Sequence, residues 1–439
     1  MRTPAQVATA ATSIRWWRRG PTGDRSRPGN EDDESRERRS TMTDSGRAAG
    51  RMLRVGMVGH GFMGAAHSHA WRTAHRFFEL PATPQMTAVA GRDARRVAEA
   101  AERQGWLSTE TDWRRLVERD DIDLIDICTP GDTHREIALA ALEAGKHVLC
   151  EKPLANTVAE AEEMADAARR ASERGRIAMC GFTYRRVPAV SLARRFVDEG
   201  RLGVIRHVRA QYLQDWLSDA TAPLTWRLDR STAGSGSLGD IGAHIIDMAQ
   251  WVVGRRIEGL SAVLRTFVTE RPIGGEFVGL GGAGSADGPK GPVSVDDATA
   301  FTARFAGGAL GVFEATRFAL GHKNSLRLEI NGSLGSVAFD FEDMNTLQYY
   351  DGADDAEAQG FRRINVTEAV HPYTGNWWPS GHGLGYEHSF THQVADLVRA
   401  IAAGEQPHPS FDDALQVQRV LAAVEASAAD RAAWHDVEG

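Results

Sequence analysis

A glycine-rich turn between an apolar run and a segment of helical length constrains this chain most. Residues 53–59 read LRVGMVG, and residues 64–78 read GAAHSHAWRTAHRFF, which predicts a strand, a turn and a helix. In the GxGxxG pattern between them, the first glycine allows a tight turn, the second lets the backbone approach a pyrophosphate, and the third permits close helix packing. The sequence therefore predicts a dinucleotide site at a helix N-terminus, formed by Gly59, Gly61, Phe62, Met63 and Gly64.

Strands and helices alternate over the first half of the chain. Further buried strands are predicted at 86–91, 124–130, 147–153 and 177–185, and helices at 93–104, 134–145 and 158–174. Continuous apolar strands joined by helices are typical of a parallel sheet that is covered on both faces. The predicted fold class of residues 51–182 is therefore α/β, a doubly wound Rossmann domain.

The pattern changes after Tyr184. A helix is expected near 189–199, and several long strand-like runs follow, joined by short turns such as FAGGA and INGSLGS. This is typical of a mainly antiparallel sheet. We predict an α+β domain over 183–439 with a large open-faced sheet, which serves substrate binding and oligomerisation as a homodimer or homotetramer. Residues 273–292 are rich in glycine and are predicted to form a long surface loop without strands.

Residues 1–50 are rich in arginine, serine, glycine and acidic residues, with almost no periodic apolar positions, so we expect a disordered extension. The pair Arg18-Arg19 is not followed by the roughly 7 to 15 apolar residues of an export signal. An alternative is that Met42 or Met52 is the true start.

Composition narrows the class of partner. The net charge is −8 and no basic stripe recurs, which argues against nucleic acid, and no run approaches the roughly 20 apolar residues of a membrane span. The three cysteines, Cys128, Cys150 and Cys180, lie in separate apolar runs and are expected to be core thiols. We therefore expect a cytoplasmic protein with a small-molecule partner.

The end of the second predicted strand bears on cofactor choice. An acidic residue there binds the ribose 2′-hydroxyl of NAD, whereas an arginine accommodates the 2′-phosphate of NADP. This chain has Gly91-Arg92-Asp93, which permits NADP as well as NAD. The alternative, that Arg92 is simply solvated and Asp93 caps the next helix, stays open.

The segment GSGSLGDIGAHIIDMAQWVVG carries the first candidate catalytic groups. Asp240 and His244 are four residues apart on one predicted helical face, with Asp247 three further on. A histidine can take a proton from a hydroxyl group while hydride leaves the carbon, and a carboxylate can orient it. An N-cap aspartate and a core histidine are the alternative.

Together these motifs resemble the Gfo/Idh/MocA oxidoreductases. The resemblance rests on Glu151-Lys152-Pro153 and Asp240-x-Gly242-x-His244, and it extends from about residue 53 to the C-terminus. Segments such as YLQDW and PLTWRLDRSTAGSGSLGDIGAH are similar to the branch that contains levoglucosan dehydrogenase and inositol-dehydrogenase-like enzymes.

The resemblance implies an NAD- or NADP-dependent dehydrogenase acting on a secondary alcohol of a sugar or cyclitol. Lys152 would stabilise charge on the reacting oxygen, His244 would be the general base, and Asp240 its partner. Further implied cofactor residues are Arg92, Thr129, Pro130, His134, Glu151, Lys152, Trp226 and Arg227, and implied substrate residues are Lys152, Tyr184, Gln214, Trp216, Asp240 and His244. Many members carry asparagine where this chain has Gly131.

Two other functions stay open: a glycoside hydrolase that uses NAD transiently on the same fold, and a nucleotide-binding regulator without activity. A metal site is not expected. Two histidines four apart on a helix can bind a metal, but no HExxH pattern accompanies the C-terminal histidines, which are His371, His382, His388 and His392.

Overall fold

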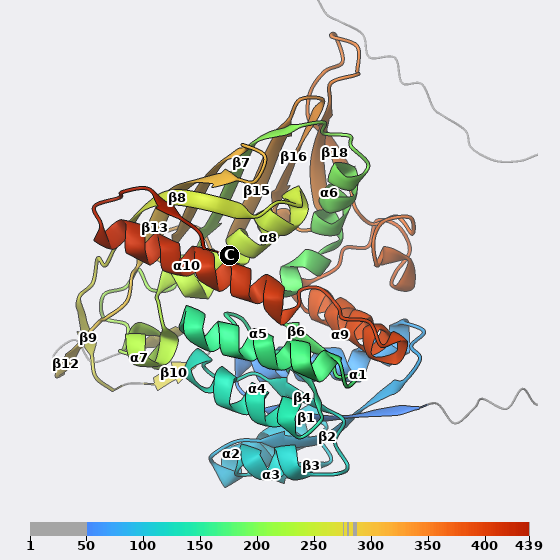
Figure 1. Cartoon of the computed structure of the whole chain (residues 1–439), viewed down its shortest axis with the longest axis vertical. Helices are drawn as coiled ribbons and strands as arrows, with labels where there is room; N and C mark the ends of the chain where they lie inside the picture. The colour runs from blue at the N-terminus through green and yellow to red at the C-terminus, as the bar shows by residue number, and fades with distance from the viewer. Residues whose placement is uncertain (1–50, 275, 279–280, 284–287, 439) are drawn as a thin grey trace, which may run out of the picture. The chain divides into compact units, whose positions relative to one another are not determined.

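The computed structural model describes residues 51–274, 276–278, 281–283 and 288–438 (Figure 1). The predicted disordered extension at 1–50, Met42 included, lies outside these residues. None of the described helices is long and apolar enough to cross a membrane.

The first half forms a parallel sheet of six strands, in the order β3-β2-β1-β4-β5-β6. Its strands are β1 (Met52–Val58), β2 (Thr83–Ala90), β3 (Ser108–Glu110), β4 (Leu124–Ile127), β5 (His147–Cys150) and β6 (Ala178–Cys180). All four residues of β4 and of β5 are buried, as expected for strands covered on both faces. The short β3 was not predicted, because its residues STE carry no apolar pattern.

Helices cover both faces of this sheet, which confirms the doubly wound prediction. They are α1 (Phe62–Phe77), α2 (Ala94–Gln104), α3 (Trp113–Glu118), α4 (His134–Glu143) and α5 (Val158–Ser172). Buried side chains of α1 and α2 join one apolar cluster, and those of α3, α4 and α5 join another. Local capping fixes the helix starts: Thr157 and Glu160 form a capping box on α5, for example. The six-residue α3 was also missed by the sequence analysis.

The second half is built on a nine-stranded sheet in the order β18-β17-β16-β15-β7-β14-β13-β8-β19. Its strands are β7 (Ile205–Leu213), β8 (Ile257–Arg265), β13 (Ala298–Phe305), β14 (Leu310–Thr316), β15 (Ser325–Gly332), β16 (Gly335–Asp340), β17 (Thr346–Asp351), β18 (Arg362–Asn365) and β19 (His435–Asp436). Only β7 and β14 pair in parallel, so the prediction of a mainly antiparallel sheet is confirmed.

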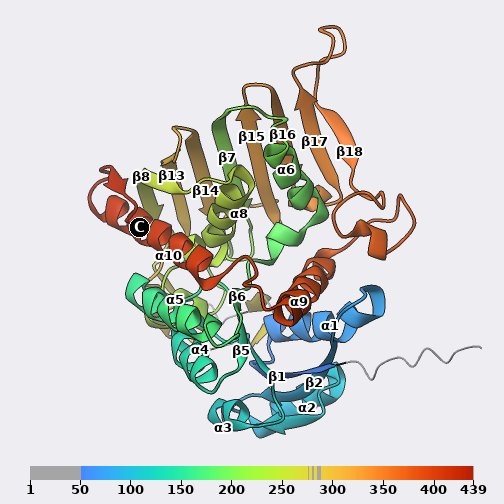
Figure 2. The same cartoon turned by 45° about the vertical axis from the view of Figure 1, so that its right-hand side comes forward.

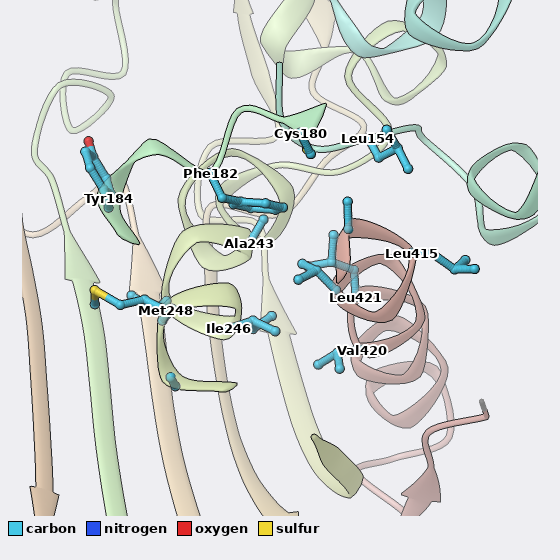
Figure 3. Packing of buried hydrophobic residues seen from close by; sticks show 14 of the residues in the cluster. Leu154, Cys180, Phe182, Tyr184, Ala243, Ile246, Met248, Leu415, Val420 and Leu421 are labelled. Atoms are coloured by element: carbon cyan, nitrogen blue, oxygen red, sulfur yellow. The ribbon is translucent and has the colours of Figure 1, made fainter. Parts of the chain in front are cut away.

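One face of the large sheet carries the helices α6 (Pro188–Asp198), α8 (Ala243–Val253) and α10 (Phe411–Ala429) (Figure 2). Alternate residues of β13 are buried and exposed, so the other face is open over this strand. Figure 3 shows the core between α8 and α10, where Phe182, Ile246 and Leu421 belong to one cluster of buried side chains.

Helix α9 (Tyr386–Ala403) lies beside α1 in both views (Figures 1 and 2). Phe390, Val394 and Leu397 of α9 join the apolar cluster of α1, β1 and β2. A helix from the second half therefore packs against the helix that follows the glycine turn.

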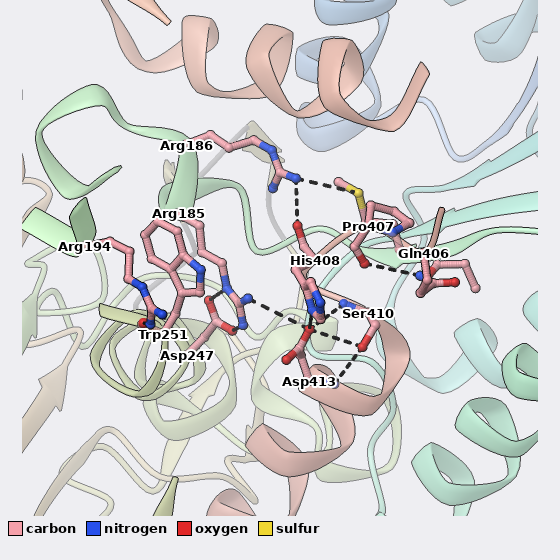
Figure 4. Close-up of polar contacts among 12 residues, drawn as sticks. Arg185, Arg186, Arg194, Asp247, Trp251, Gln406, Pro407, His408, Ser410 and Asp413 are labelled. Carbon is pink, nitrogen blue, oxygen red and sulfur yellow. Dashed lines mark hydrogen bonds and ion pairs between the residues drawn. The ribbon is translucent and has the colours of Figure 1, made fainter. Parts of the chain in front are cut away.

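A network of charged side chains in the second half of the chain lies near β6 (Figure 4). Arg185 donates from Nε to Oδ2 of Asp247 at 2.9 Å, and Asp413 lies 3.9 Å from the Arg185 guanidinium. Asp413 also accepts from the backbone N–H of Ser410 at 2.7 Å. Asp247 is therefore an internal partner of Arg185, although it follows His244 by only three residues.

The prediction of a strandless loop at 273–292 is wrong for the residues that the structure describes. The segment contains β10 (Glu276–Val278), β11 (Gly281–Ala283) and β12 (Lys290–Pro292). The first two form a short antiparallel pair, and β12 pairs with β9 (Glu270–Pro272). These strands have three residues each, too few for an alternating pattern to reveal them. The rest of the segment, at 275, 279–280 and 284–287, lies outside the described residues.

Candidate functional site

The three glycines of the turn have different steric surroundings. Gly59 has φ +98°, and a Cβ atom there would lie 2.6 Å from the carbonyl oxygen of Cys128. A Cβ on Gly64 would lie 2.4 Å from the carbonyl oxygen of Gly59, whereas one on Gly61 would meet nothing within 4 Å. Gly61 is also the N-cap of α1 and provides no side-chain cap. The helix N-terminus is therefore open toward an anion at Gly61.

Two alanine substitutions separate these roles. Gly64→Ala forces a methyl group against a carbonyl, so we expect a stability loss of about 1–3 kcal/mol in thermal or urea unfolding, together with weaker cofactor binding.

In Gly61→Ala the added methyl group meets no protein atom, so we expect unchanged stability. The affinity for NAD should be about tenfold lower by fluorescence titration, a loss of about 1.4 kcal/mol. Wild-type affinity in Gly61→Ala would contradict a pyrophosphate contact at this turn.

The segment after β2 explains why no acidic residue ends that strand. A Cβ on Gly91 would lie 2.4 Å from the ring of His60, so a larger residue at 91 would displace that ring. Asp93 caps α2 and accepts a hydrogen bond from the backbone N–H of Arg96 at 3.0 Å. This is the helix-capping role that the sequence analysis gave as the alternative. The Arg92 side chain is exposed and forms no ion pair within the described part of the chain. It is therefore free to meet a ligand.

His134 joins two loops at the carboxyl ends of β4 and β5. Its ring is buried, with Nε2 2.8 Å from the carbonyl oxygen of Thr129 and Nδ1 3.0 Å from that of Pro153. Burial lowers the pKa of His134, which favours a neutral ring. A neutral ring has a single N–H, so His134 donates to one of these two carbonyls and lies against the other, between the Thr129-Pro130 and Lys152-Pro153 segments.

Gly131 leaves room for another side chain. A Cβ on Gly131 would lie 2.5 Å from Oδ1 of Asn156. Asn156 donates from Nδ2 to the carbonyl oxygen of Thr232 at 3.0 Å, in α7 (Arg230–Ala233). An amide therefore occupies the space next to Gly131, but it comes from the loop after β5.

Lys152 and Asp240 meet across the two halves of the chain. Lys152 Nζ donates to the backbone carbonyl of Asp240 at 2.7 Å and lies 3.7 Å from its Oδ1. Asp240 sits in a five-residue π-helical turn, Leu238–Gly242, which directly precedes α8. Such turns are frequent at functional sites. Two ammonium protons of Lys152 are left for another acceptor.

Asp240 is surrounded by cations. Arg317 directly follows β14, is fully buried, and approaches Oδ2 of Asp240 at 3.4 Å. Burial alone would raise the pKa of Asp240, but Lys152, Arg317 and Arg227 outweigh it and hold that pKa below its usual range. Arg227 lies over the ring of Trp226, 4.4 Å from its centroid. The surrounding cations therefore favour the anionic form of Asp240.

His244 lies in α8 among aromatic rings. It is 7% exposed, and its ring centroid is 4.5 Å from that of Tyr184. Burial first, and the nearby Lys152 second, hold the pKa of His244 well below its ordinary value. Neither ring nitrogen forms a hydrogen bond with a described residue, and Nδ1 is buried without a partner. The predicted bond to Asp240 is thus not seen; Asp240 pairs with cations.

A hydrogen-bonded row of polar side chains brings the predicted substrate residues together. The Tyr184 and Tyr212 hydroxyls are 3.0 Å apart, and Tyr212 donates to Oδ1 of Asn324 at 2.7 Å. Gln214 donates to the same oxygen at 2.8 Å and accepts from Trp216 Nε1 at 2.9 Å. Tyr184 and Tyr212 also face the His244 ring. The row forms a polar wall beside the candidate base.

Sequence reasoning missed three members of this site: Arg317, Tyr212 and Asn324. A signal existed for Arg317, which is a charged residue directly after the strand-like run ALGVFEAT. Asn324 lies in a short connection where polar residues are common, so nothing distinguished it.

The C-terminal histidines have local partners. His392 accepts from Trp377 Nε1 at 2.7 Å and its Nδ1 lies 2.9 Å from the carbonyl oxygen of Arg186, and burial lowers its pKa to about 3. His388 accepts from the backbone N–H of Gly385 at 2.9 Å, and His371 from that of Glu368 at 3.0 Å. Nδ1 of His382 lies 2.8 Å from the carbonyl oxygen of Pro379. Each of these four histidines thus has at least one hydrogen-bond partner within the protein.

Comparison with known proteins gives a consistent result for both halves. Residues 53–181 match the oxidoreductase family with an NAD-binding Rossmann fold, and residues 190–338 match the GFO/IDH/MocA C-terminal domain. Levoglucosan dehydrogenase of Pseudarthrobacter phenanthrenivorans is 44% identical over 88% of this chain and 98% of its own length. Myo-inositol 2-dehydrogenase of Thermotoga maritima is 27% identical over 82% of this chain and 92% of its own.

Solved structures agree. An oxidoreductase domain protein from Kribbella flavida is 62% identical, with a TM-score of 0.84 over 89% of this chain and 100% of that one. Levoglucosan dehydrogenase in complex with NADH and levoglucosan is 42% identical, with a TM-score of 0.82 over 89% of this chain and 100% of that one.

Proposed function

The chain belongs to the GFO/IDH/MocA oxidoreductase family, and on this premise we propose that it oxidises a secondary ring hydroxyl of an anhydrosugar, glucoside or cyclitol with a nicotinamide cofactor. The observation that carries the proposal is the meeting of Lys152 with Asp240 beside the neutral His244, next to a polar wall. An ammonium donor and a neutral imidazole are the two groups that alcohol oxidation needs.

The open N-terminus of α1 fits a dinucleotide. Gly61 has free space where a Cβ would be, and the first backbone N–H groups of α1 have no side-chain cap. Gly59, Gly61, Phe62, Met63 and Gly64 would hold the pyrophosphate, and Thr129, Pro130, Glu151, Trp226 and Arg227 would border the rest. When bound, the nicotinamide ring accepts the hydride that leaves the substrate carbon.

Lys152 and His244 divide the remaining work. Lys152 Nζ donates to the substrate oxygen and stabilises the negative charge that grows there as the O–H bond breaks. His244 takes the hydroxyl proton on a ring nitrogen, so the products are a ketone, reduced cofactor and one proton on the imidazole. Asp240 holds Lys152 through its backbone carbonyl and balances the surrounding cations. In this scheme Asp240 is a counter-ion of Lys152 more than an orienting partner of His244.

Absorbance at the reduced-nicotinamide band tests the proposal. The panel should contain inositols, glucosides and anhydrosugars, each with NAD and NADP, and levoglucosan comes first because the 44% identical relative is a levoglucosan dehydrogenase. We expect a rise in absorbance with at least one cyclic secondary alcohol. Release of free sugar without a net absorbance change would instead indicate glycoside cleavage, and no turnover across the panel would contradict the proposal.

A substitution of Arg92 tests the choice between NADP and NAD. If its guanidinium meets the 2′-phosphate, Arg92→Ser should lower kcat/KM for NADP about tenfold, the worth of one charge-assisted contact of about 1.4 kcal/mol. The value for NAD should stay within about twofold, because NAD offers no charge at that position. Parallel loss with both cofactors would show that Arg92 acts on the fold and not on the 2′-phosphate.

The open face of the large sheet supports a homo-oligomer. Val263, Leu310 and Val312 expose 57%, 52% and 41% of their surface, and Leu310 and Val312 alternate with buried residues along β14. We propose that this face joins copies of the chain as a homodimer or homotetramer, measurable by light scattering.

The free thiols of Cys128, Cys150 and Cys180 support a cytoplasmic location.

A further inference from the structure

A row of buried charged side chains ends at the loop that carries Lys152. Asp126 lies in β4, His67 in α1, and Glu151 directly after β5; they are 0%, 1% and 4% exposed. His67 Nδ1 lies 2.9 Å from Oδ2 of Asp126, and His67 Nε2 lies 2.9 Å from Oε1 of Glu151. One imidazole thus bridges two buried carboxylates.

The bridge calls for a positively charged ring. Ionised carboxylates only accept hydrogen bonds, so both ring nitrogens of His67 have to donate. Burial opposes that charge, but Asp126 outweighs burial, and the pKa of His67 lies well above its ordinary value. The far end of the row is fixed as well, because Trp71 Nε1 donates to Asp126 at 2.7 Å. Phe390 of α9 packs against the imidazole at 5.5 Å between ring centroids.

The near end of the row reaches the backbone of Lys152. The Lys152 N–H donates to Oε2 of Glu151 at 3.2 Å. A Cβ on Gly181 would lie 2.7 Å from Oε1 of Glu151, so this glycine leaves the room that the carboxylate needs. The row therefore connects α1, which begins at the glycine turn, with the lysine whose ammonium meets Asp240.

We propose that His67 is a positioning residue for the reaction: its imidazolium clamps Glu151, and Glu151 fixes the backbone of Lys152 so that the ammonium stays at one place beside Asp240. His67 has no direct role in proton or hydride transfer, and it acts through Lys152 alone. The kinetic part of this inference rests on the proposed dehydrogenase function.

Two amide substitutions each reproduce one ring nitrogen. His67→Gln keeps a donor near the position of Nε2, toward Glu151, whereas His67→Asn keeps one near Nδ1, toward Asp126. We expect His67→Asn to lower kcat about tenfold or more, as a misplaced catalytic group does, and His67→Gln to stay within about threefold of wild type. KM for NAD should change less than about twofold in both variants, because His67 lies outside the glycine turn. His69→Gln, on the same helix and outside the row, is the matched control and should behave as wild type.

A double-mutant cycle distinguishes positioning from a general loss of structure. In the Lys152→Ala background, His67→Asn should leave the residual rate unchanged, because Lys152 is no longer there to be positioned. Additive losses in the cycle would overturn the proposal, and so would equal kcat values for His67→Asn and His67→Gln.

Hydrogen exchange gives a readout that needs no substrate. The peptide covering residues 149–154 should exchange faster in His67→Asn than in wild type, His67→Gln or His69→Gln. Equal exchange in all four proteins would overturn the proposal, even if the sugar panel had shown no turnover and the proposed function had failed. Should His67→Asn not fold, Glu151→Gln tests the same link: wild-type exchange and kcat in that variant would likewise overturn it.

Discussion

Replacement of Lys152 by alanine is expected to lower kcat by about a thousandfold, the upper end of what one preorganised donor to a developing oxyanion contributes. The ammonium of Lys152 has a fixed position, since its Nζ donates to the carbonyl of Asp240 at 2.7 Å and only 13% of its side chain is exposed. A donor that needs no reorganisation gives most of its effect in the transition state. The loss should therefore appear in kcat and kcat/KM alike.

Cofactor binding provides the internal control for Lys152→Ala. The glycine turn of α1 does not depend on the lysine side chain, so NADH fluorescence should report a dissociation constant within about threefold of wild type, below 1 kcal/mol. Lys290→Ala removes an exposed lysine in β12 and should leave both kcat and NADH binding unchanged. Wild-type turnover in Lys152→Ala would refute the mechanism, whereas parallel loss of NADH binding would assign Lys152 to the cofactor.

The fold was predictable where hydrophobic period and turn chemistry agree. LRVGMVG, LIDI and HVLC are mainly apolar runs, and β1, β4 and β5 lie there because a parallel sheet buries both faces. Short elements escaped prediction: β3, β10, β11 and β12 have three residues each and α3 has six, so no period can develop in them. The return of α9 to α1 also escaped, because a helical stripe does not specify its distant partner.

The sequence predicted which residues form the candidate site better than it predicted which of them pair with one another. Asp240 and His244 were identified from their helical spacing and Lys152 from the family resemblance, but the contact of Lys152 with Asp240 was not predicted. The predicted bond between Asp240 and His244 is absent because Arg317, distant in sequence, competes for the carboxylate. Ion pairs between distant segments depend on tertiary packing, which local periodicity does not encode. The same holds for the pairing of Asp247 with Arg185.

Replacement of His244 by asparagine is expected to lower kcat about 10²- to 10⁴-fold, the usual range for loss of a general base. Asparagine keeps a polar group among Tyr184, Tyr212 and Phe182 but cannot accept the proton. Thermal unfolding should show a folded variant, because Nδ1 of His244 has no partner to lose. His207→Asn, on the large sheet at β7, is the control and should retain full activity.

The pH profile of kcat/KM shows in which direction protonation of His244 changes the rate. Burial and Lys152 lower the pKa of His244 well below the ordinary 6.5, so the ring is neutral and able to accept a proton throughout the neutral range. As the pH falls through this depressed pKa the ring becomes protonated, and kcat/KM should decline on an acid limb that lies below 6.5. The limb should vanish from the residual rate of His244→Asn, because an amide does not titrate.

Asp240 is the competing origin of an acid limb, and the same profile separates the two. Lys152, Arg317 and Arg227 hold the pKa of Asp240 below its ordinary 3.8, so its protonation comes at lower pH than that of a free carboxylate. Asp240→Asn should weaken turnover by releasing Lys152 and Arg317 from their counter-charge, yet the limb of His244 should remain in the residual activity. If the limb persists in His244→Asn and disappears in Asp240→Asn, the carboxylate is the base, and the neutral imidazole serves only to shape the pocket.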